Sequence, residues 1–215
     1  MKAYVISYKF EEVTPVVWRK VILPADVTFN RLHELIQYTT NFLSYMEPYH
    51  YFEFPLDEEN LIITNNPYLI EQYVADKKRF NGVVLKQPSS IKIDRYIEKY
   101  GQLSYLYDYG DGWHIHIKLE EIVDDYYFGY PTLLDGAGDA PPEDVGGPAG
   151  FALFLEKYHA EHPETLTWAQ IQRYEPFDTQ RINNLLKAVA YKKTQWDKIN
   201  HKNYIILSDK YRKPD

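Results

Sequence analysis

Large aromatic and aliphatic residues recur at every second position along the first part of the chain. This alternation runs from Tyr4 to Phe10 and predicts a strand with one buried face. A second extended run over 16–23 is rich in β-branched residues, which favour strands. The charged, proline-containing segment between the two runs predicts a hairpin turn, so the chain begins with two neighbouring strands.

The spacing of apolar residues then changes. Thr28 is a candidate N-cap, and Phe29, Leu32 and Ile36 follow it at helical spacing. Residues 49–54 are rich in aromatic side chains and return to an extended pattern. The order strand, strand, helix, strand is compatible with a β-grasp-like start, although many α+β folds share it.

Short elements are predicted in the middle of the chain. A strand is expected over 61–64, and a helix begins at Pro67 and runs to about Lys78. A short strand at 91–93 and a helix ending at Gly101 follow. The turn residues between these segments separate them clearly.

The clearest strand pair is predicted over 103–108 and 113–122. Gly110 and Gly112 lie in the short connection between the two strands, and glycine supplies the positive φ that such tight turns need. The alternation of the second strand gives it one core-facing side, formed by Trp113, Ile115, Ile117 and Leu119.

The last third of the chain changes character. Residues 131–150 are dense in glycine, proline and aspartate, which predicts an irregular but ordered loop. Helices are expected over 151–158 and 165–173. A longer helix capped by Asp178 follows, with an apolar stripe formed by Ile182, Leu185, Leu186, Val189 and Trp196.

These patterns predict an α+β fold with a mixed, mostly antiparallel sheet and a hairpin–helix start. One α+β domain is expected over residues 1–160. Residues 161–215 are expected to form a helical extension packed on that domain.

Composition narrows the function classes. The 215 residues include 24 Lys and Arg against 31 Asp and Glu, and a net charge of −7 argues against the basic surface of a nucleic-acid-binding protein. Cysteine is absent, which excludes disulfides, thiolate metal sites and a cysteine nucleophile. The 21 tyrosines suit half-buried sheet faces and recognition surfaces alike. No secretory signal and no apolar run of about 20 residues is visible, which predicts a soluble cytoplasmic protein.

Three segments carry a family resemblance. They are VVWRKVILPADVTFNRLHELIQ at 16–37, YLYDYGDGWHIHIKLEEI at 105–122 and PTLLDGAGDAPPEDVGGPAGFALFLE at 131–156. In this order they resemble the plasmid pRiA4b ORF-3-like family over about residues 3–160. The resemblance implies an α+β fold but no established activity. Members are often described as transposon-associated or resolvase-like, whereas this acidic chain offers no placed nucleophilic serine, arginine cluster or basic DNA-binding tail.

The chain departs from the family pattern at two positions. Family members often carry cysteines where this chain has Leu133 and Ala140. If those cysteines bind metal elsewhere in the family, the site is altered here. If they pack in the core, Leu and Ala are natural replacements, because a free cysteine behaves as a small hydrophobic residue.

Two histidines on the predicted hairpin form the first candidate site. His114 and His116 project from one face of a strand, about 6.5–7 Å apart. With Asp108 or Asp111 as a further ligand they could hold a transition metal. The alternative is a solvated sheet face, on which the two aspartates satisfy backbone amides of the turn.

The carboxylates of the predicted loop form the second candidate site. Asp135, Asp139, Glu143 and Asp144 lie close together in a glycine-rich segment and could bind Ca²⁺ or Mg²⁺. Their spacing does not match that of an EF-hand. The alternative is a structural role, in which they form turns and cap the helix that follows.

Further candidates lie nearer the start of the chain. Trp18 and Arg19 could recognise a ligand through a cation–π contact, or Trp18 could be buried while Arg19 pairs with a carboxylate across the sheet. His33 or His50 could complete a histidine-rich site with the hairpin histidines, or each could be a satisfied structural group.

Lysines and one arginine are concentrated over 192–213, among aromatic residues. Weak nucleic-acid binding is conceivable there, and a solvated helix face is the alternative. Nothing in the chain matches a P-loop, a Rossmann glycine motif, a zinc-protease helix or a nucleophile elbow.

The preferred interpretation is a non-enzymatic binding or accessory module. It would bind an unknown small molecule or protein in a tyrosine-rich cleft between the hairpin and the 135–147 loop. The candidate cleft residues are Asp108, Asp111, Trp113, His114, His116, Asp135, Asp139, Glu143 and Asp144.

Two rival interpretations remain. One is a metal-dependent hydrolase in which His114 and His116 hold a divalent metal and Asp111 or Glu143 acts as the base. The other, a mobile-element DNA-associated protein, follows from the family description alone. Neither a membrane nor a nucleic acid is expected as a partner.

Overall fold

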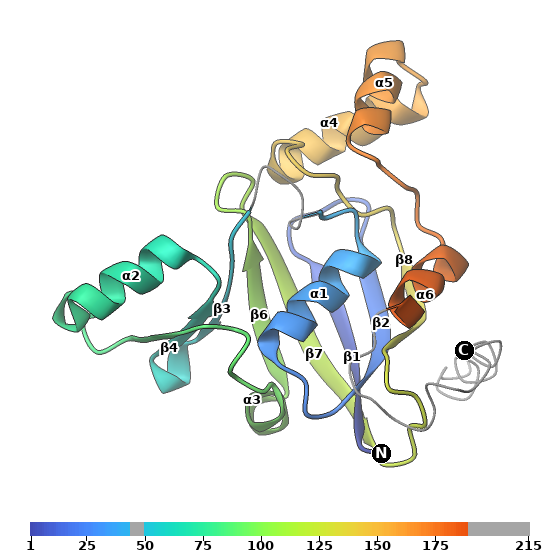
Figure 1. The fold of residues 1–215 in the computed structure, drawn as a ribbon. Helices are drawn as coiled ribbons and strands as arrows, with labels where there is room; N and C mark the ends of the chain where they lie inside the picture. Colours follow the sequence, from blue (N-terminus) through green and yellow to red (C-terminus); the bar gives the residue numbers. More distant parts are fainter. Residues whose placement is uncertain (44–49, 189–215) are drawn as a thin grey trace.

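Eight strands form one mixed sheet in the computed structural model, which describes residues 1–43 and 50–188 (Figure 1). Their order across the sheet is β5-β4-β3-β6-β7-β1-β2-β8. Strands β4 and β5 pair in parallel, whereas the other neighbouring strands pair antiparallel. The strands are β1 (Ala3–Phe10), β2 (Trp18–Pro24), β3 (Phe52–Leu56), β4 (Leu61–Thr64), β5 (Val84–Lys86), β6 (Gln102–Tyr107), β7 (Trp113–Val123) and β8 (Thr132–Ala137). The predicted α+β class with a mostly antiparallel sheet is therefore confirmed.

The helices have the following bounds. They are α1 (Phe29–Thr39), α2 (Pro67–Ala75), α3 (Asp94–Tyr100), α4 (Gly147–His159), α5 (Pro163–Ile171) and α6 (Thr179–Ala188), with short 3-10 helices η1 (Asp57–Glu59) and η2 (Lys77–Phe80). None of the helices in the described part of the chain is long and apolar enough to cross a membrane.

The helix α1 covers one face of the sheet (Figure 1). Its N-cap is Thr28, whose side chain accepts a hydrogen bond from the backbone N–H of Arg31. The buried face of α1 packs on aromatic residues of the sheet, and the rings of Phe29 and Phe54 lie 4.9 Å apart. Burial of these large side chains is the main source of stability for this layer.

The start of β1 is buried on both faces, although the sequence pattern predicted one. Tyr4 and Ile6 face the main core, whereas Val5 packs on the opposite side with Tyr126 and Phe128. The segment after β7 therefore covers the second face of the sheet at this end.

Strand β4 and helix α2 lie at one side of the molecule (Figure 1), at the end of the sheet whose edge strand is β5. None of the nine residues of α2 is buried, and Tyr68 and Val74 are exposed. The predicted helix to Lys78 was too long, because α2 ends at Ala75 and η2 follows. The short strand predicted at 91–93 was wrong, since only an isolated bridge joins this segment to the start of α1.

The predicted hairpin is present as β6 and β7. Tyr107 pairs with Trp113 at its closed end. Alternation along β7 buries Trp113, Ile115 and Ile117, while His114 is exposed and His116 is half-buried on the other face. This alternation is expected, because successive side chains of a strand point to opposite faces of the sheet.

The segment 131–150 is not irregular throughout, which corrects the prediction. Residues 132–137 form β8, which pairs with β2. The buried side chains of Leu133 and Leu134 favour this placement, and pairing with a distant strand outweighs the local glycine and aspartate content. The helix α4 also starts earlier than predicted, at Gly147.

Helices near the carboxyl end share the main core. Ala169, Ile182 and Leu186 are buried in the same cluster as β1, β6 and α1 residues. The division at residue 160 stays a prediction. Of the expected apolar stripe, Leu185 is 39% exposed, and Val189 and Trp196 lie outside the described residues.

Candidate metal centre

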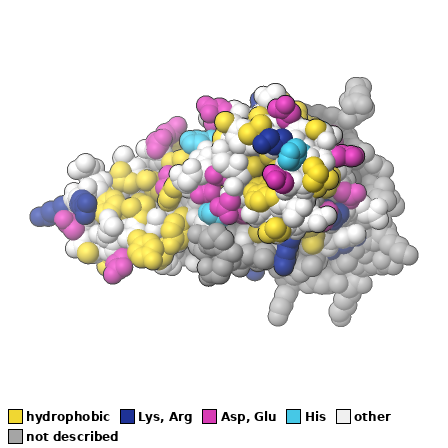
Figure 2. Space-filling view, turned by 90° about the horizontal axis from the view of Figure 1, so that it is seen from above, with side chains coloured by type: hydrophobic (Ala, Val, Ile, Leu, Met, Phe, Trp, Pro, Cys, Tyr) yellow, Lys and Arg dark blue, Asp and Glu magenta, His cyan; other side chains and the backbone are white. Residues whose placement is uncertain are grey.

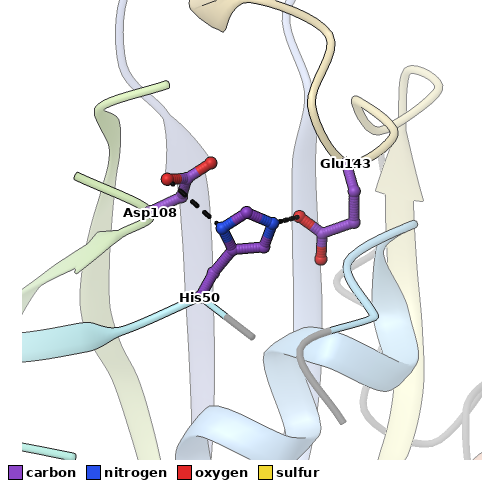
Figure 3. A group of neighbouring side chains, drawn as sticks. All are labelled: His50, Asp108 and Glu143. Carbon is purple, nitrogen blue, oxygen red and sulfur yellow. Dashed lines mark ion pairs between the residues drawn. The ribbon is translucent and has the colours of Figure 1, made fainter. Parts of the chain in front are cut away.

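Three segments that are distant in the sequence bring His50, Asp108 and Glu143 together (Figure 3). His50 lies just before β3, Asp108 follows β6, and Glu143 lies in the loop between β8 and α4. One nitrogen of the imidazole faces Asp108 and the other faces Glu143, so the ring stands between two carboxylates (Figure 3).

The distances around the imidazole are longer than hydrogen bonds. His50 Nδ1 lies 3.4 Å from Asp108 Oδ1. His50 Nε2 lies 3.6 Å from Glu143 Oε2 and 3.5 Å from Asp144 Oδ1. Good hydrogen bonds between nitrogen and oxygen are about 2.7–3.2 Å long. Accordingly, His50 Nε2 and Glu143 Oε2 are buried atoms that have no hydrogen-bond partner in the described part of the chain.

The other oxygen of Glu143 is fixed firmly. Its Oε1 accepts a hydrogen bond of 2.6 Å from the hydroxyl of Tyr107 and another from the backbone N–H of Leu43. The Glu143 side chain is 8% exposed. These contacts hold the carboxylate in one orientation, in which Oε2 is directed at His50 (Figure 3).

Burial raises the pKa of Glu143 above its usual value, because the charged form loses hydration. The negative charge of Asp108 adds to this rise, while the hydrogen bonds from Tyr107 and Leu43 and the charge of His50 oppose it. A cation close to Oε2 would relieve the energetic penalty of burying this carboxylate.

Asp108 is held by the turn of the hairpin. Its φ of 54° is in the left-handed region, which Asp tolerates better than most residues. The Oδ1 of Asp108 accepts a hydrogen bond of 2.9 Å from the backbone N–H of Gly110. Asp108 therefore satisfies a backbone amide of the turn, which is the structural role considered from the sequence. The same Oδ1 also faces His50 Nδ1.

The hairpin and the loop are tied to each other beside this cluster. Asp111 Oδ2 accepts a hydrogen bond of 3.1 Å from the backbone N–H of Gly146. On the other side of the loop, Asn41 Nδ2 donates to the carbonyl of Ala140 at 2.8 Å. The loop that carries Glu143 and Asp144 is thus fixed at both ends.

Two ligand separations in the cluster suit a divalent metal ion. A tetrahedral ion with ligand distances of about 2.0–2.2 Å holds its ligand atoms roughly 3.3–3.6 Å apart. The two separations from His50 Nε2, 3.6 Å to Glu143 Oε2 and 3.5 Å to Asp144 Oδ1, match that spacing. One imidazole with two carboxylates is a donor set typical of Zn²⁺ or Mn²⁺.

The histidines of the hairpin lie elsewhere. His114 and His116 are on the outer face of β7, opposite the core. In the described residues, the one group of three or more His, Asp and Glu side chains with ligand atoms within 4.8 Å of one another is His50, Asp108 and Glu143. Hence the structure does not join the hairpin histidines to Asp108 or Asp111.

The remaining candidates of the cleft are spread over the loop and the core. Asp135 is exposed and accepts from the backbone N–H of Gly136. Asp139 Oδ1 accepts from the backbone N–H of Phe177 at 2.7 Å, which ties the loop to the segment before α6. Trp113 is buried among Phe10, Phe42 and Phe151, so its ring packs in the core.

Arg19 contradicts the expected pairing with a carboxylate across the sheet. It is 1% exposed and donates to the backbone carbonyls of Trp18, Thr39 and Ala137. Its guanidinium lies 4.1 Å from the centroid of the Phe177 ring. Arg19 therefore joins β2, α1 and β8 within the core, while Trp18 is half-buried.

His33 is a core residue and not part of the cluster. Its ring is stacked on Phe52 at 3.8 Å, and its Nδ1 lies 2.8 Å from the hydroxyl of Tyr105. Of the histidines weighed from the sequence, His50 is the one that meets carboxylates at a buried site. No local motif marks it, because its partners come from distant segments.

Comparison with known proteins places the chain among its relatives. A model of plasmid pRiA4b ORF-3-like proteins matches residues 2–185. The chain belongs to this family. It is 30% identical over 202 residues to the uncharacterized protein y4hQ of Sinorhizobium fredii (strain NBRC 101917 / NGR234), with 91% of this chain and 96% of that protein covered.

A solved protein structure is also similar to this chain. It is the crystal structure of a protein of unknown function, MM3350, from Methanosarcina mazei Go1. The TM-score is 0.62 at 26% identity, covering 83% of this chain and 96% of that chain. One relative is uncharacterized and the other is of unknown function, so neither assigns an activity to the site.

The two positions at which this family member departs from the cysteine pattern are both in the core. Leu133 is 0% exposed and Ala140 is 2% exposed. Their surroundings suit small or aliphatic side chains, which favours the packing interpretation of the family cysteines.

Proposed function

We propose that this chain is a binding protein whose primary ligand is a divalent transition-metal ion, held by His50 and Glu143 and by Asp144, an exposed side chain that has to turn toward Glu143 when the ion binds. The observation that carries the proposal is the pair of buried atoms His50 Nε2 and Glu143 Oε2. They face each other at 3.6 Å and neither has a hydrogen-bond partner among the described residues. Native proteins rarely leave two such atoms unsatisfied.

Asp108 has a different part in the proposed site. It faces His50 Nδ1, on the side of the ring away from Glu143. Metal-ligating histidines commonly direct their second nitrogen at a carboxylate, which fixes the tautomer and strengthens the ligand. Asp108 is therefore a positioning residue, and the ion lies on the Nε2 side.

Three protein ligands leave at least one coordination position open. Catalytic and ligand-binding zinc sites have this composition, whereas structural zinc sites have four protein ligands. Asp144 is the exposed member of the set, with 47% of its side chain accessible. The open position would therefore face solvent on the Asp144 side and could take water or an oxygen donor of a second ligand.

The test is metal titration of the full chain after removal of any affinity tag and of bound metal. Isothermal titration calorimetry with Zn²⁺ and Mn²⁺ should give about one equivalent at micromolar or lower Kd for the wild type. Glu143→Gln, which keeps the size and the hydrogen bonds to Tyr107 and Leu43, should bind at least about 100-fold more weakly. His50→Ala should do the same.

A control variant distinguishes this site from the hairpin histidines. The double variant His114→Ala, His116→Ala should bind metal as the wild type does. If it loses the metal while Glu143→Gln keeps it, the proposed site is wrong and the hydrolase interpretation based on the hairpin gains support. A folded wild-type protein that binds neither ion at micromolar concentration also overturns the proposal.

A further inference from the structure

A pocket of about 220 Å³ lies beside β3, β6 and β7 and shares no residue with the proposed metal centre. Among the described residues, β3 pairs with β6 through Phe52 and Glu53 alone. Farther along these strands, Pro55 of β3 and Ser104 of β6 both line the pocket. The pocket therefore lies where the two strands no longer pair, and Pro55 has no N–H with which to extend the pairing.

His116, one of the two hairpin histidines, lines this pocket. It pairs with Ser104 across β6 and β7, so the two side chains project from the same face of the sheet. His116 is half-buried, whereas His114 is exposed and does not line the pocket. The two histidines that look equivalent in the sequence therefore have different surroundings in the fold.

The polar side chains of the pocket are free to bind a ligand. They are those of Asp57, Glu58, Gln102, Ser104 and His116. Within the described part of the chain, none of these side chains makes a hydrogen bond or an ion pair. The buried residues Leu56 and Leu103 add apolar surface to the same pocket.

The lining carries negative charge. Asp57 and Glu58 contribute two carboxylates, and neither Lys nor Arg lines the pocket. Two cations of α3, Arg95 and Lys99, are paired with Glu59 at 3.0 and 2.9 Å. Acidic side chains are also spread over the upper face of the molecule (Figure 2), and the chain has a net charge of −7. The pocket therefore favours a cationic ligand over an anionic one.

Tyr100 is a fixed part of the lining. Its hydroxyl donates to Glu59 at 2.8 Å and accepts from Lys99 at 2.7 Å, so the ring is held in place. The volume is smaller than the roughly 300–1,000 Å³ of pockets for drug-sized ligands. A compound with a short carbon chain suits this space better than a large one.

We propose that this pocket binds a small amino alcohol, a protonated primary amine with a hydroxyl group at the other end of a short carbon chain. An ammonium group has three donors and no acceptor, which matches the carboxylates of Asp57 and Glu58. A hydroxyl group both donates and accepts, which suits the mixed polar groups of Gln102 and Ser104. The carbon chain would lie on the apolar surface of the pocket.

The test compares aminobutanol, with its two polar groups at opposite ends, with pentanol and pentylamine. Each of these two compounds replaces one polar group by a methyl group of similar size. Aminobutanol should bind saturably to the full chain with a Kd in the millimolar range or lower. Pentanol, which lacks the ammonium, should bind at least about tenfold more weakly, and pentylamine, which lacks the hydroxyl, about three- to tenfold more weakly.

Binding is measured by nuclear magnetic resonance, through the ring signals of the seven histidines, in the presence of a chelator. The chelator removes any contribution of the proposed metal centre. One histidine signal should shift with aminobutanol and should be absent from the spectrum of His116→Ala, which should also bind more weakly. The matched control, His114→Ala, should keep both the shifting signal and the affinity.

Charge variants separate the pocket from general electrostatic attraction. Asp57→Asn and Glu58→Gln should each weaken the binding of aminobutanol about fivefold. Glu121→Gln is the control, because Glu121 is an exposed carboxylate that does not line the pocket. It should leave the affinity unchanged. Since all three positions are exposed, none of these changes should prevent folding.

Three outcomes overturn the proposal. They are the absence of saturable binding at millimolar aminobutanol, equal affinities for aminobutanol and pentanol, and an equal loss of affinity in Glu58→Gln and Glu121→Gln. Failure of the zinc titration would overturn the proposed metal centre and leave this inference standing, because no ligand of that centre lines the pocket.

Discussion

Asp111 Oδ2, in the turn between β6 and β7, accepts a hydrogen bond from the backbone N–H of Gly146, 3.1 Å away. This contact joins the hairpin that carries Asp108 to the loop that carries Glu143 and Asp144. Both halves of the proposed site therefore depend on one side chain that makes no contact with the ion itself.

The first prediction follows from this link. Asp111→Ala removes the acceptor and should weaken Zn²⁺ binding about tenfold, because the loop is no longer held in register with the hairpin. Asp111→Asn keeps an acceptor oxygen and should bind zinc within about threefold of the wild type. Calorimetric titration of the two variants measures the difference. Equal zinc affinities in Ala and Asn variants would show that the link does not organise the site.

The second prediction concerns stability. At a zinc concentration about 100-fold above Kd, the wild-type free energy of unfolding should increase by about 2.7 kcal/mol, because the ion binds the folded state. Glu143→Gln should gain almost nothing. Without metal, the variant should be as stable as the wild type or slightly more stable at neutral pH, since it removes a buried carboxylate with a raised pKa. Urea denaturation with and without zinc provides the comparison.

Local sequence was enough to predict the hairpin and the starts of α1, α2 and α6. Alternation from Trp113 to Ile117 and the glycines of the turn specify β6 and β7 directly. The N-cap at Thr28 likewise marks the start of α1. These features depend on neighbours within a few residues, so the sequence pattern contains the necessary information.

The features that the sequence did not predict depend on contacts between residues that are distant in the chain. The strand β8 forms because β2 offers it a partner, and glycine and aspartate content alone pointed to a loop. The sequence makes Glu143 and Asp144 candidate metal ligands because they are carboxylates of a glycine-rich loop. It makes Asp108 a candidate ligand because it lies in the turn of the hairpin. His50 was a lone histidine, and only the tertiary fold brings it between the carboxylates. From the sequence, His114 and His116 are the stronger metal-ligand candidates, because the two-residue spacing of a strand can be read directly from it. In the structure they are exposed and half-buried.

The third prediction uses the buried imidazole of His33. Burial lowers the pKa of His33 to about 3, whereas an unfolded histidine titrates near 6.5. Between these values the unfolded chain binds a proton that the folded protein does not. Stability should therefore decrease as pH falls below about 6.5, by up to about 1.4 kcal/mol per pH unit.

A variant isolates this contribution. His33→Gln retains a polar group that can reach the Tyr105 hydroxyl but has no titration in this range. Its free energy of unfolding, measured in urea between pH 5 and 7.5, should depend on pH less steeply than that of the wild type. Parallel pH profiles for the two proteins would rule out His33 as the source.

The fourth prediction concerns Gly147, at the start of α4. A Cβ added there would lie 2.6 Å from the backbone oxygen of Asp111, and its φ is +68°. Gly147→Ala should displace the loop from the hairpin and weaken zinc binding at least about tenfold. Gly82→Ala is the control, since its φ is +88° but nothing lies within 4 Å of the added Cβ. It should cost about 1 kcal/mol of stability and leave zinc affinity unchanged.

The fifth prediction tests whether the carboxyl-terminal helices fold together with the sheet. Asn183 of α6 is 1% exposed. It donates to the carbonyl of Leu133 at 3.0 Å and accepts from its backbone N–H at 2.8 Å. The side chain thereby satisfies both backbone groups of Leu133 at the outer edge of the sheet. Asn183→Ala leaves them buried without this partner and should lower the free energy of unfolding by about 2–4 kcal/mol.

The neighbouring Asn184 is exposed, so Asn184→Ala should change stability by no more than about 0.5 kcal/mol. If residues 161–188 fold with the rest of the chain, Asn183→Ala will shift a single transition, seen alike in far-ultraviolet circular dichroism and in tryptophan fluorescence. If they form an extension that melts by itself, the variant will show an early circular dichroism transition while the core transition stays in place. The first outcome is expected, because Ile182 and Leu186 pack in the same core as the sheet and α1.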